Sequence, residues 1–299
     1  MKTPSPMRRW EDQLAPEEKR RLRKGMYILP SLFTAANIGA GYYALSQTLQ
    51  ATQTEFWHFD FAAMAIGVAV VADGLDGRIA RMTNTTSDFG REFDSLADVI
   101  TFGVAPAVLA WMWGFRLVPD VGIDVGIPGA HAKMIQLGLL ATFIFLVAGA
   151  SRLARFNIQV NPQPSNPGRP GRKYFVGLPI PAGAAVVAAT IHLVRGYPIL
   201  HWQLAPLWFA LLIVVGFLMV STWRFYSFKD LNLRNRRPFQ TLILICGFLG
   251  LLVAFHNHML FIMSITYMLS GVFTRLSYMF RRRPPQPTEP VYKEAPQPR

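Results

Sequence analysis

The sequence predicts an all-α fold, a polytopic membrane helix bundle, and its composition is the first observation that does so. Only 16% of the 299 residues are charged, whereas 52% are hydrophobic. Ordinary soluble domains are about 25% charged. The second observation is a series of long apolar stretches, since a transmembrane helix needs about 20 mostly apolar residues. Eight stretches qualify: 26–49, 58–80, 94–115, 134–155, 176–195, 203–221, 238–256 and 259–277.

The distribution of basic residues is the third observation. With eight spans, both termini and every second loop lie on one side, and that side holds 27 of the 30 Lys and Arg residues. The opposite side keeps only Arg116, Lys133 and Arg195. Positive residues stay cytoplasmic, so we expect both termini inside the cell. The net charge of +13 is spread over every inner loop, which favours anionic headgroups over nucleic acid as its partner.

The chain begins with a charged arm, residues 1–25, that ends in a basic run. This arm mixes good helix formers with a basic face and could form an amphipathic helix on the membrane surface. The apolar stretch 26–49 that follows is long enough to span, so we expect a first transmembrane helix and no cleavable signal peptide.

Proline marks three later parts of the chain. Pro179 and Pro181 interrupt the fifth apolar stretch. The loop 161–174 is too rich in Pro and Gly for a helix and could be a lid over a cytoplasmic site or a simple connector. The tail 281–299 is rich in proline and charge, and we expect it to be disordered.

Four aspartates at the ends of two neighbouring spans carry the functional argument. Asp73 and Asp76 close the second apolar stretch, and Asp94 and Asp98 open the third. Spacings of three and four place each pair on one helical face. Because the connection between these spans is short and polar, the two helices should be antiparallel neighbours. We therefore expect four carboxylates to converge at the cytoplasmic end of the bundle.

Such a cluster favours divalent cations. Like charges a few ångströms apart repel strongly in a partly dry site, so either some carboxyls are protonated or cations lie among them. Mg²⁺ and Mn²⁺ prefer carboxylate oxygens and often share their coordination with a substrate phosphate. No His or Cys accompanies the acids, which argues against zinc. Two bridged metals are a common clamp for in-line displacement at phosphorus.

Small and basic residues around the acids are consistent with a phosphate ligand. Gly74 and Gly77 leave the helix backbone accessible, and Arg81 can offer a forked donor to phosphate. A simpler interpretation is that these are solvated acids at helix ends, and the helix dipole alone would favour Asp94. Ionisable groups within spans are, however, functional in most membrane proteins.

The spacing of these residues resembles the signature of the CDP-alcohol phosphatidyltransferases. That resemblance implies integral membrane enzymes, usually dimeric, that displace CMP from a CDP-linked lipid with an alcohol. It also implies a core of six transmembrane helices over residues 26–221, with residues 222–280 forming two additional C-terminal spans. The matching pattern reads Asp73-x2-Asp76-Gly77-x2-Ala80-Arg81-x8-Gly90-x3-Asp94-x3-Asp98.

Four further segments resemble one branch of that family, the integral membrane CDP-diacylglycerol–serine O-phosphatidyltransferases. They are PSLFTAANIGAGYYAL (30–45), SDFGREFDSLADVITFGVAPA (87–107), SRLARFN (151–157) and FVGLPIPAGAA (175–185). This resemblance implies the reaction of CDP-diacylglycerol with L-serine to phosphatidylserine and CMP. It further implies two divalent cations, Mg²⁺ or Mn²⁺, a homodimer, and an active site on the cytoplasmic face of a bacterial inner membrane.

The resemblance also implies residue roles. Asp98 would be the general base and could also touch one metal. The expected metal ligands are Asp73, Asp76, Asp94 and Asp98, and the expected contacts to CDP-diacylglycerol are Gly77, Arg81, Ser87 and Asn37. A zwitterionic acceptor needs a cation for its carboxylate, and the candidates are Arg152 and Arg155, with Asn157 as a further polar contact. Both arginines could instead be cytoplasmic side chains that extend toward the headgroups.

Three alternatives stay open at this point. The same chemistry could use another alcohol, such as glycerol-3-phosphate, an inositol phosphate or choline. A membrane prenyltransferase also binds a diphosphate through metals, but its two aspartate motifs lie on distant helices, whereas these four acids fall within 26 residues. A cation transporter would place its acids near the bilayer midplane, and these lie at one edge.

Overall fold

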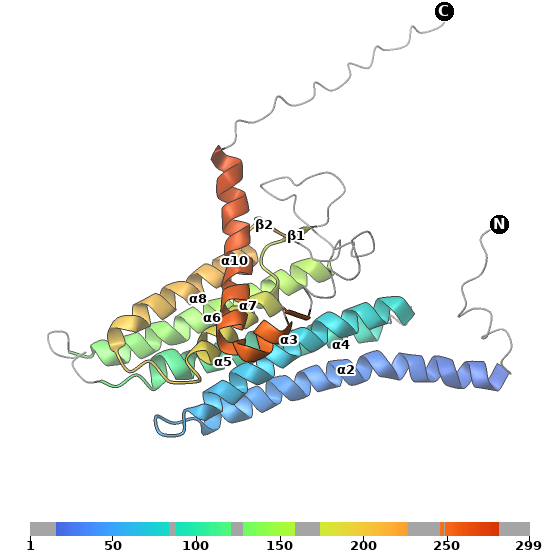
Figure 1. Cartoon of the computed structure of the whole chain (residues 1–299), viewed down its shortest axis with the longest axis horizontal. Helices are drawn as coiled ribbons and strands as arrows, with labels where there is room; N and C mark the ends of the chain where they lie inside the picture. The colour runs from blue at the N-terminus through green and yellow to red at the C-terminus, as the bar shows by residue number, and fades with distance from the viewer. Residues whose placement is uncertain are drawn as a thin grey trace, which may run out of the picture.

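The computed structural model describes residues 16–83, 88–120, 128–158, 174–226, 246–247 and 249–280, with side chains from residue 32 to 74 and from residue 89 onward within those ranges. These residues form a bundle of helices with one small sheet (Figure 1). The chain is a polytopic helical membrane protein, as the apolar stretches predict. Its main elements are α2 (Pro16–Gln50), α3 (Trp57–Thr83), α4 (Asp88–Asp98), α5 (Ala105–Trp111), α6 (Ala130–Asn157), β1 (Tyr174–Val176), α7 (Ile180–Leu193), α8 (Ala205–Val220), β2 (Arg224–Tyr226) and α10 (His256–Phe280).

Among the described residues, five helical segments are long and apolar enough to cross a membrane. They correspond to the second, third, fourth, sixth and eighth predicted stretches. The third is longer than predicted, because α4 continues without a break through two π-helical turns and α5. These segments are Trp57–Gly74, Phe89–Arg116, Ala130–Asn157, Trp202–Val220 and His256–Phe280.

The structure describes the first predicted stretch in full and the seventh only in part. Helix α2 contains the whole first stretch, and it begins at Pro16, so the end of the basic arm is continuous with this helix. The part of the seventh stretch before residue 246 lies outside the described residues. Residues 1–15, 159–173 and 281–299 lie outside them as well, so the predicted lid and tail are untested.

The fifth predicted stretch forms a shorter helix than expected. Helix α7 starts only at Ile180, since Pro179 has extended backbone angles (φ −59°, ψ 143°) and Pro181 occupies the first turn. Proline is favoured at this position, where its missing N–H has no helical partner. Ahead of it, Gly177 has φ 76°, and a Cβ there would meet the carbonyl oxygen of Met219. Glycine at this position therefore allows the chain to turn and to pass close to the end of α8.

A two-stranded antiparallel sheet corrects the all-α expectation. Strand β1 pairs with β2 through Tyr174–Tyr226, Phe175–Phe225 and Val176–Arg224. Strands of three residues are too short to show a periodic pattern, so they could not be predicted from the sequence. The sheet joins the chain before α7 to the chain after α8, and its buried Phe225 contacts Gly271 of α10.

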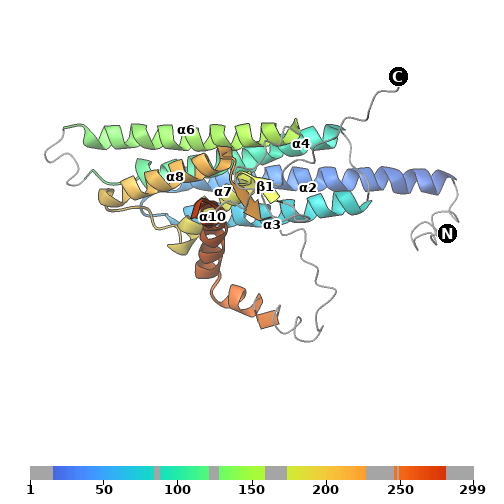
Figure 2. The same ribbon diagram turned by 90° about the horizontal axis from the view of Figure 1, so that it is seen from above.

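The helices pack in an order that brings distant segments together. Helix α2 packs on α3 and α4, α3 on α7, and α6 on α8. Figure 2 shows α6 along one side of the bundle and α3 on the opposite side, with α7 between them. Helix α10 packs on α7 and β2 and crosses the bundle at a steep angle in both views (Figure 1, Figure 2).

The interior and the outer surface follow the rules of a membrane bundle. Phe59, Phe102 and Phe145 are fully buried between helices, whereas Val68 and Phe143 are more than half exposed. Apolar side chains on the outside are expected where the surroundings are lipid, and small residues allow helices to approach closely.

Candidate functional site

Three of the four predicted aspartates meet at one end of the bundle. Asp73 lies toward the end of α3, and Asp94 and Asp98 lie on successive turns of α4. Each offers one carboxylate oxygen, and these oxygens all lie within 4.8 Å of one another. Asp98 is the most buried, with 8% of its surface exposed. Asp76 follows in α3, but its side chain is outside the described residues.

The donor set fits a hard divalent cation. Oδ1 of Asp94 and Oδ1 of Asn37 are buried and have no hydrogen-bond partner among the described residues. An unpaired buried acceptor is costly, and three carboxylates at this separation repel one another. A cation bound by carboxylate and amide oxygens relieves both costs, and such oxygens are the ligands that Mg²⁺ and Mn²⁺ prefer.

Helix α2 holds the most buried acid in place. Asn37 is 2% exposed, and its Nδ2 donates to Oδ1 of Asp98 over 3.4 Å. The hydroxyl of Thr101 donates to the carbonyl oxygen of Asn37 over 2.8 Å. Asn37, which the sequence predicts to contact the nucleotide, therefore also contacts Asp98. The nucleotide contact stays a prediction.

Gly41 permits this approach of α2 to the third span. A Cβ at Gly41 would lie 2.6 Å from Oγ1 of Thr101. We expect Gly41→Leu to lower the free energy of unfolding by about 1–3 kcal/mol, the usual cost of overpacking, measured by thermal or denaturant unfolding in detergent. Gly39→Leu is the matched control, because nothing lies within 4 Å of a Cβ at Gly39. Equal stability of the two variants would contradict this role of Gly41.

Arg152 brings a buried positive charge to the carboxylates. It lies in α6 and is 8% exposed. The opposite charge of Asp98 is close enough to attract its guanidinium, and Tyr267 of α10 lies nearby. Its Cζ lies 5.5 Å from the ring centre of Phe156 and 6.0 Å from that of Phe175. A buried cation requires partners of this kind, because removal from water is costly.

The other two predicted acceptor residues make contacts between helices. Nη1 of Arg155 donates to the carbonyl oxygen of Val220 at the end of α8, over 3.1 Å. Nδ2 of Asn157 donates to Oγ of Ser95 in α4, over 2.7 Å. Both side chains therefore tie α6 to its neighbours, and only Arg152 of the three has a described interaction with Asp98.

The predicted nucleotide contacts on the α3 side are described only in part. Gly77 and Arg81 lie in the last turns of α3, where side chains are outside the described residues, and Ser87 lies outside them entirely. Their roles stay predictions.

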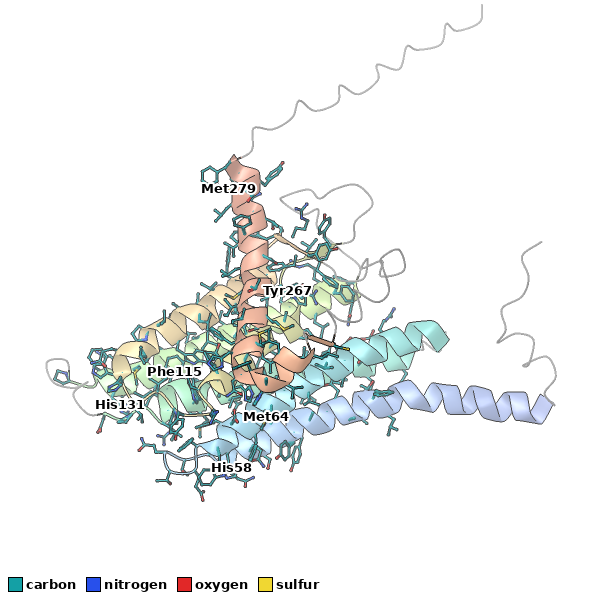
Figure 3. The ribbon with its side chains drawn as sticks, viewed as in Figure 1. His58, Met64, Phe115, His131, Tyr267 and Met279 are labelled. Atoms are coloured by element: carbon teal, nitrogen blue, oxygen red, sulfur yellow. The ribbon has the colours of Figure 1, made fainter. Side chains whose placement is uncertain are left out.

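Two aromatic residues of this site were missed by sequence reasoning. Phe175 lies in β1 and Tyr267 in the middle of α10, where Figure 3 labels it. Phe175 was within a segment used for the family resemblance, but Tyr267 stands in an apolar helix without a local signal. Only the packing of α10 against the sheet brings Tyr267 to Arg152.

Comparisons with known proteins point to one family. Residues 27–205 match the family model described as CDP-alcohol phosphatidyltransferase. The chain is 35% identical over 260 residues to the CDP-diacylglycerol–serine O-phosphatidyltransferase of Helicobacter pylori (strain ATCC 700392 / 26695), covering 86% of this chain and 94% of that protein. Proteins of the same name are 30% identical in Bacillus subtilis (strain 168), over 68% of this chain and 93% of the relative, and 35% identical in Methanocaldococcus jannaschii, over 55% and 63%.

Proposed function

Because the chain belongs to the CDP-alcohol phosphatidyltransferase family, we propose that it transfers the phosphatidyl group of CDP-diacylglycerol to L-serine, giving phosphatidylserine and CMP. The observation that carries this proposal is the group of Asp73, Asp94 and Asp98, whose oxygens lie within 4.8 Å of one another at the end of two spans. The names of the relatives support serine as the acceptor.

The aspartates have two tasks in this proposal. Asp73, Asp94 and Asp98, together with Asp76, would hold two divalent cations, Mg²⁺ or Mn²⁺. When bound, these cations would neutralise the pyrophosphate and the charge that develops on departing CMP. Asp98 also accepts the hydroxyl proton of serine as the serine oxygen attacks the diacylglycerol-linked phosphorus. The new P–O bond forms as the bond to CMP breaks, and the proton stays on the Asp98 carboxylate.

Neighbouring side chains orient the reactants. The amide of Asn37 donates to Oδ1 of Asp98 and so orients the carboxylate that accepts the serine proton. Arg152 offers its guanidinium to the serine carboxylate, close to Asp98. Gly77, Arg81 and Ser87 would contact the CDP portion of the lipid.

The location at the end of two spans suits a lipid substrate. The acyl chains can remain in the bilayer between helices, while serine and the nucleotide product exchange with the aqueous side. We propose that this side is the cytoplasm of a bacterial cell, that both termini lie there, and that the protein works as a homodimer.

An acceptor panel tests the proposed substrate. The purified protein in detergent or liposomes would be given CDP-diacylglycerol, Mg²⁺ or Mn²⁺, and one of serine, glycerol-3-phosphate, an inositol phosphate or choline. We expect CMP release and a new phospholipid with serine, and only background without an acceptor. Faster release with another alcohol would contradict serine specificity and support the same chemistry with that acceptor.

A further inference from the structure

Helix α2 touches the third span at a point directly beside the proposed base. Asp98 and Thr101 lie three residues apart, where α4 continues into the π-helical turn Val99–Val104. Asn37 of α2 has hydrogen bonds to both of these residues. One turn further along α2, a Cβ at Gly41 would lie 2.9 Å from the Cα of Thr101. The backbones of the two helices are therefore in close contact here.

Thr101 uses its hydroxyl differently from several other threonines in the helices. A threonine within a helix can donate to the carbonyl oxygen four residues earlier in the same helix, as Thr48, Thr142 and Thr190 do. Thr101 is fully buried, but its hydroxyl donates to the carbonyl oxygen of Asn37 over 2.8 Å. This hydrogen bond therefore joins two helices, whereas the other three stay within one.

The bond from Thr101 fixes the part of α2 that carries the Asn37 amide. The hydrogen bond from Nδ2 of Asn37 to Oδ1 of Asp98 is 3.4 Å long, which is near the upper limit for such a bond. A small shift of α2 away from the third span would therefore break it. The π-helical turn that begins directly after Asp98 is consistent with a functional role, because such turns occur frequently at functional sites.

We propose that Thr101 is a positioning residue for the reaction: its hydroxyl holds the backbone of Asn37 in the place from which the Asn37 amide orients the Asp98 carboxylate. This inference rests on the proposed function, in which Asp98 is the base. Thr101 acts on the base through Asn37 and not on the acceptor. Removal of its hydroxyl should therefore lower kcat and change the KM for serine little.

The test compares Thr101→Val with Thr142→Val. Both variants replace a buried threonine by a side chain of the same shape without the hydroxyl, but the described bonds of the Thr142 hydroxyl stay within α6. We expect Thr101→Val to lower the kcat of serine-dependent CMP release about 10-fold, roughly the effect of one hydrogen bond. The KM for serine should stay within about 2-fold of its value in the unmodified protein. Thr142→Val should leave kcat and the KM for serine nearly unchanged, and the two variants should have similar melting temperatures.

Two further variants separate positioning from general packing. Thr101→Ser keeps the hydroxyl, so its kcat should stay within about 2-fold of that of the unmodified protein, and it decides the question if Thr101→Val is unstable. If Thr101 acts through Asn37, then Thr101→Val should lower kcat little further in an Asn37→Ala background, so that the two effects are not additive.

Four results would each overturn the inference while the unmodified protein shows serine-dependent CMP release. They are an unchanged kcat for Thr101→Val, an equal loss in Thr101→Ser, an equal loss in Thr142→Val, and additive effects with Asn37→Ala. An unmodified protein without serine-dependent release would overturn the proposed function itself.

Discussion

Replacement of Asp98 by Asn is expected to lower serine-dependent CMP release by about 10²–10⁴-fold, the range that a general base contributes. The amide keeps the size of the side chain but cannot accept the hydroxyl proton. Asp98 is 8% exposed and already accepts from Asn37, so bulk water cannot readily substitute for it. Release of CMP would be followed with purified protein and CDP-diacylglycerol at saturating serine and metal.

Glu92→Gln is the matched control for that variant. Glu92 belongs to the same helix, but its side chain is 62% exposed and pairs with Arg91 at 3.6 Å. We expect nearly normal activity from Glu92→Gln. If Asp98→Asn and Glu92→Gln retained similar activity, Asp98 would not be the base.

Removal of divalent metal is expected to abolish CMP release, with recovery on addition of Mg²⁺ or Mn²⁺. The physical reason is that the described carboxylates lie too close together to bind a pyrophosphate without compensating positive charge. Asp94→Asn should raise the metal concentration needed for half-maximal activity by at least about 10–100-fold, since even partners outside the first coordination sphere have effects of that size.

The control for Asp94→Asn is Asp120→Asn, because Asp120 lies between the third predicted span and α6 and does not belong to the described group of Asp73, Asp94 and Asp98. Its metal requirement should equal that of the unmodified protein. Full activity in the presence of a strong chelator, or an unchanged metal requirement for Asp94→Asn, would contradict the proposed metal site.

Much of the bundle could be predicted because membrane helices are specified locally. A membrane-spanning helix needs about 20 apolar residues. The segments that form α3, α6 and α8 show this apolar length in the sequence itself, without knowledge of the tertiary structure. The convergence of Asp73, Asp94 and Asp98 was predictable for a similar reason. The spacing of the aspartates places each pair on one face of its helix. The short connection between the two spans makes the two helices neighbours.

Other parts depend on contacts between residues far apart in the chain. Pairing of Phe175 with Phe225 exists only because α7 and α8 return the chain to the same place. Arg155 and Arg152 look equivalent in sequence, but the end of α8 offers a carbonyl oxygen to Arg155. Tyr267 reaches the site only through α10 and the sheet. None of these contacts can be predicted from a local sequence pattern.

The most direct test of the account is a measurement of Mn²⁺ binding to the purified protein by electron paramagnetic resonance, without substrate. We expect bound Mn²⁺ in the unmodified protein and in Glu92→Gln, displacement by Mg²⁺, and a large loss of binding in Asp94→Asn. Equal binding by the Asp94→Asn variant and the unmodified protein would contradict the claim that the aspartates of these two spans form a metal site.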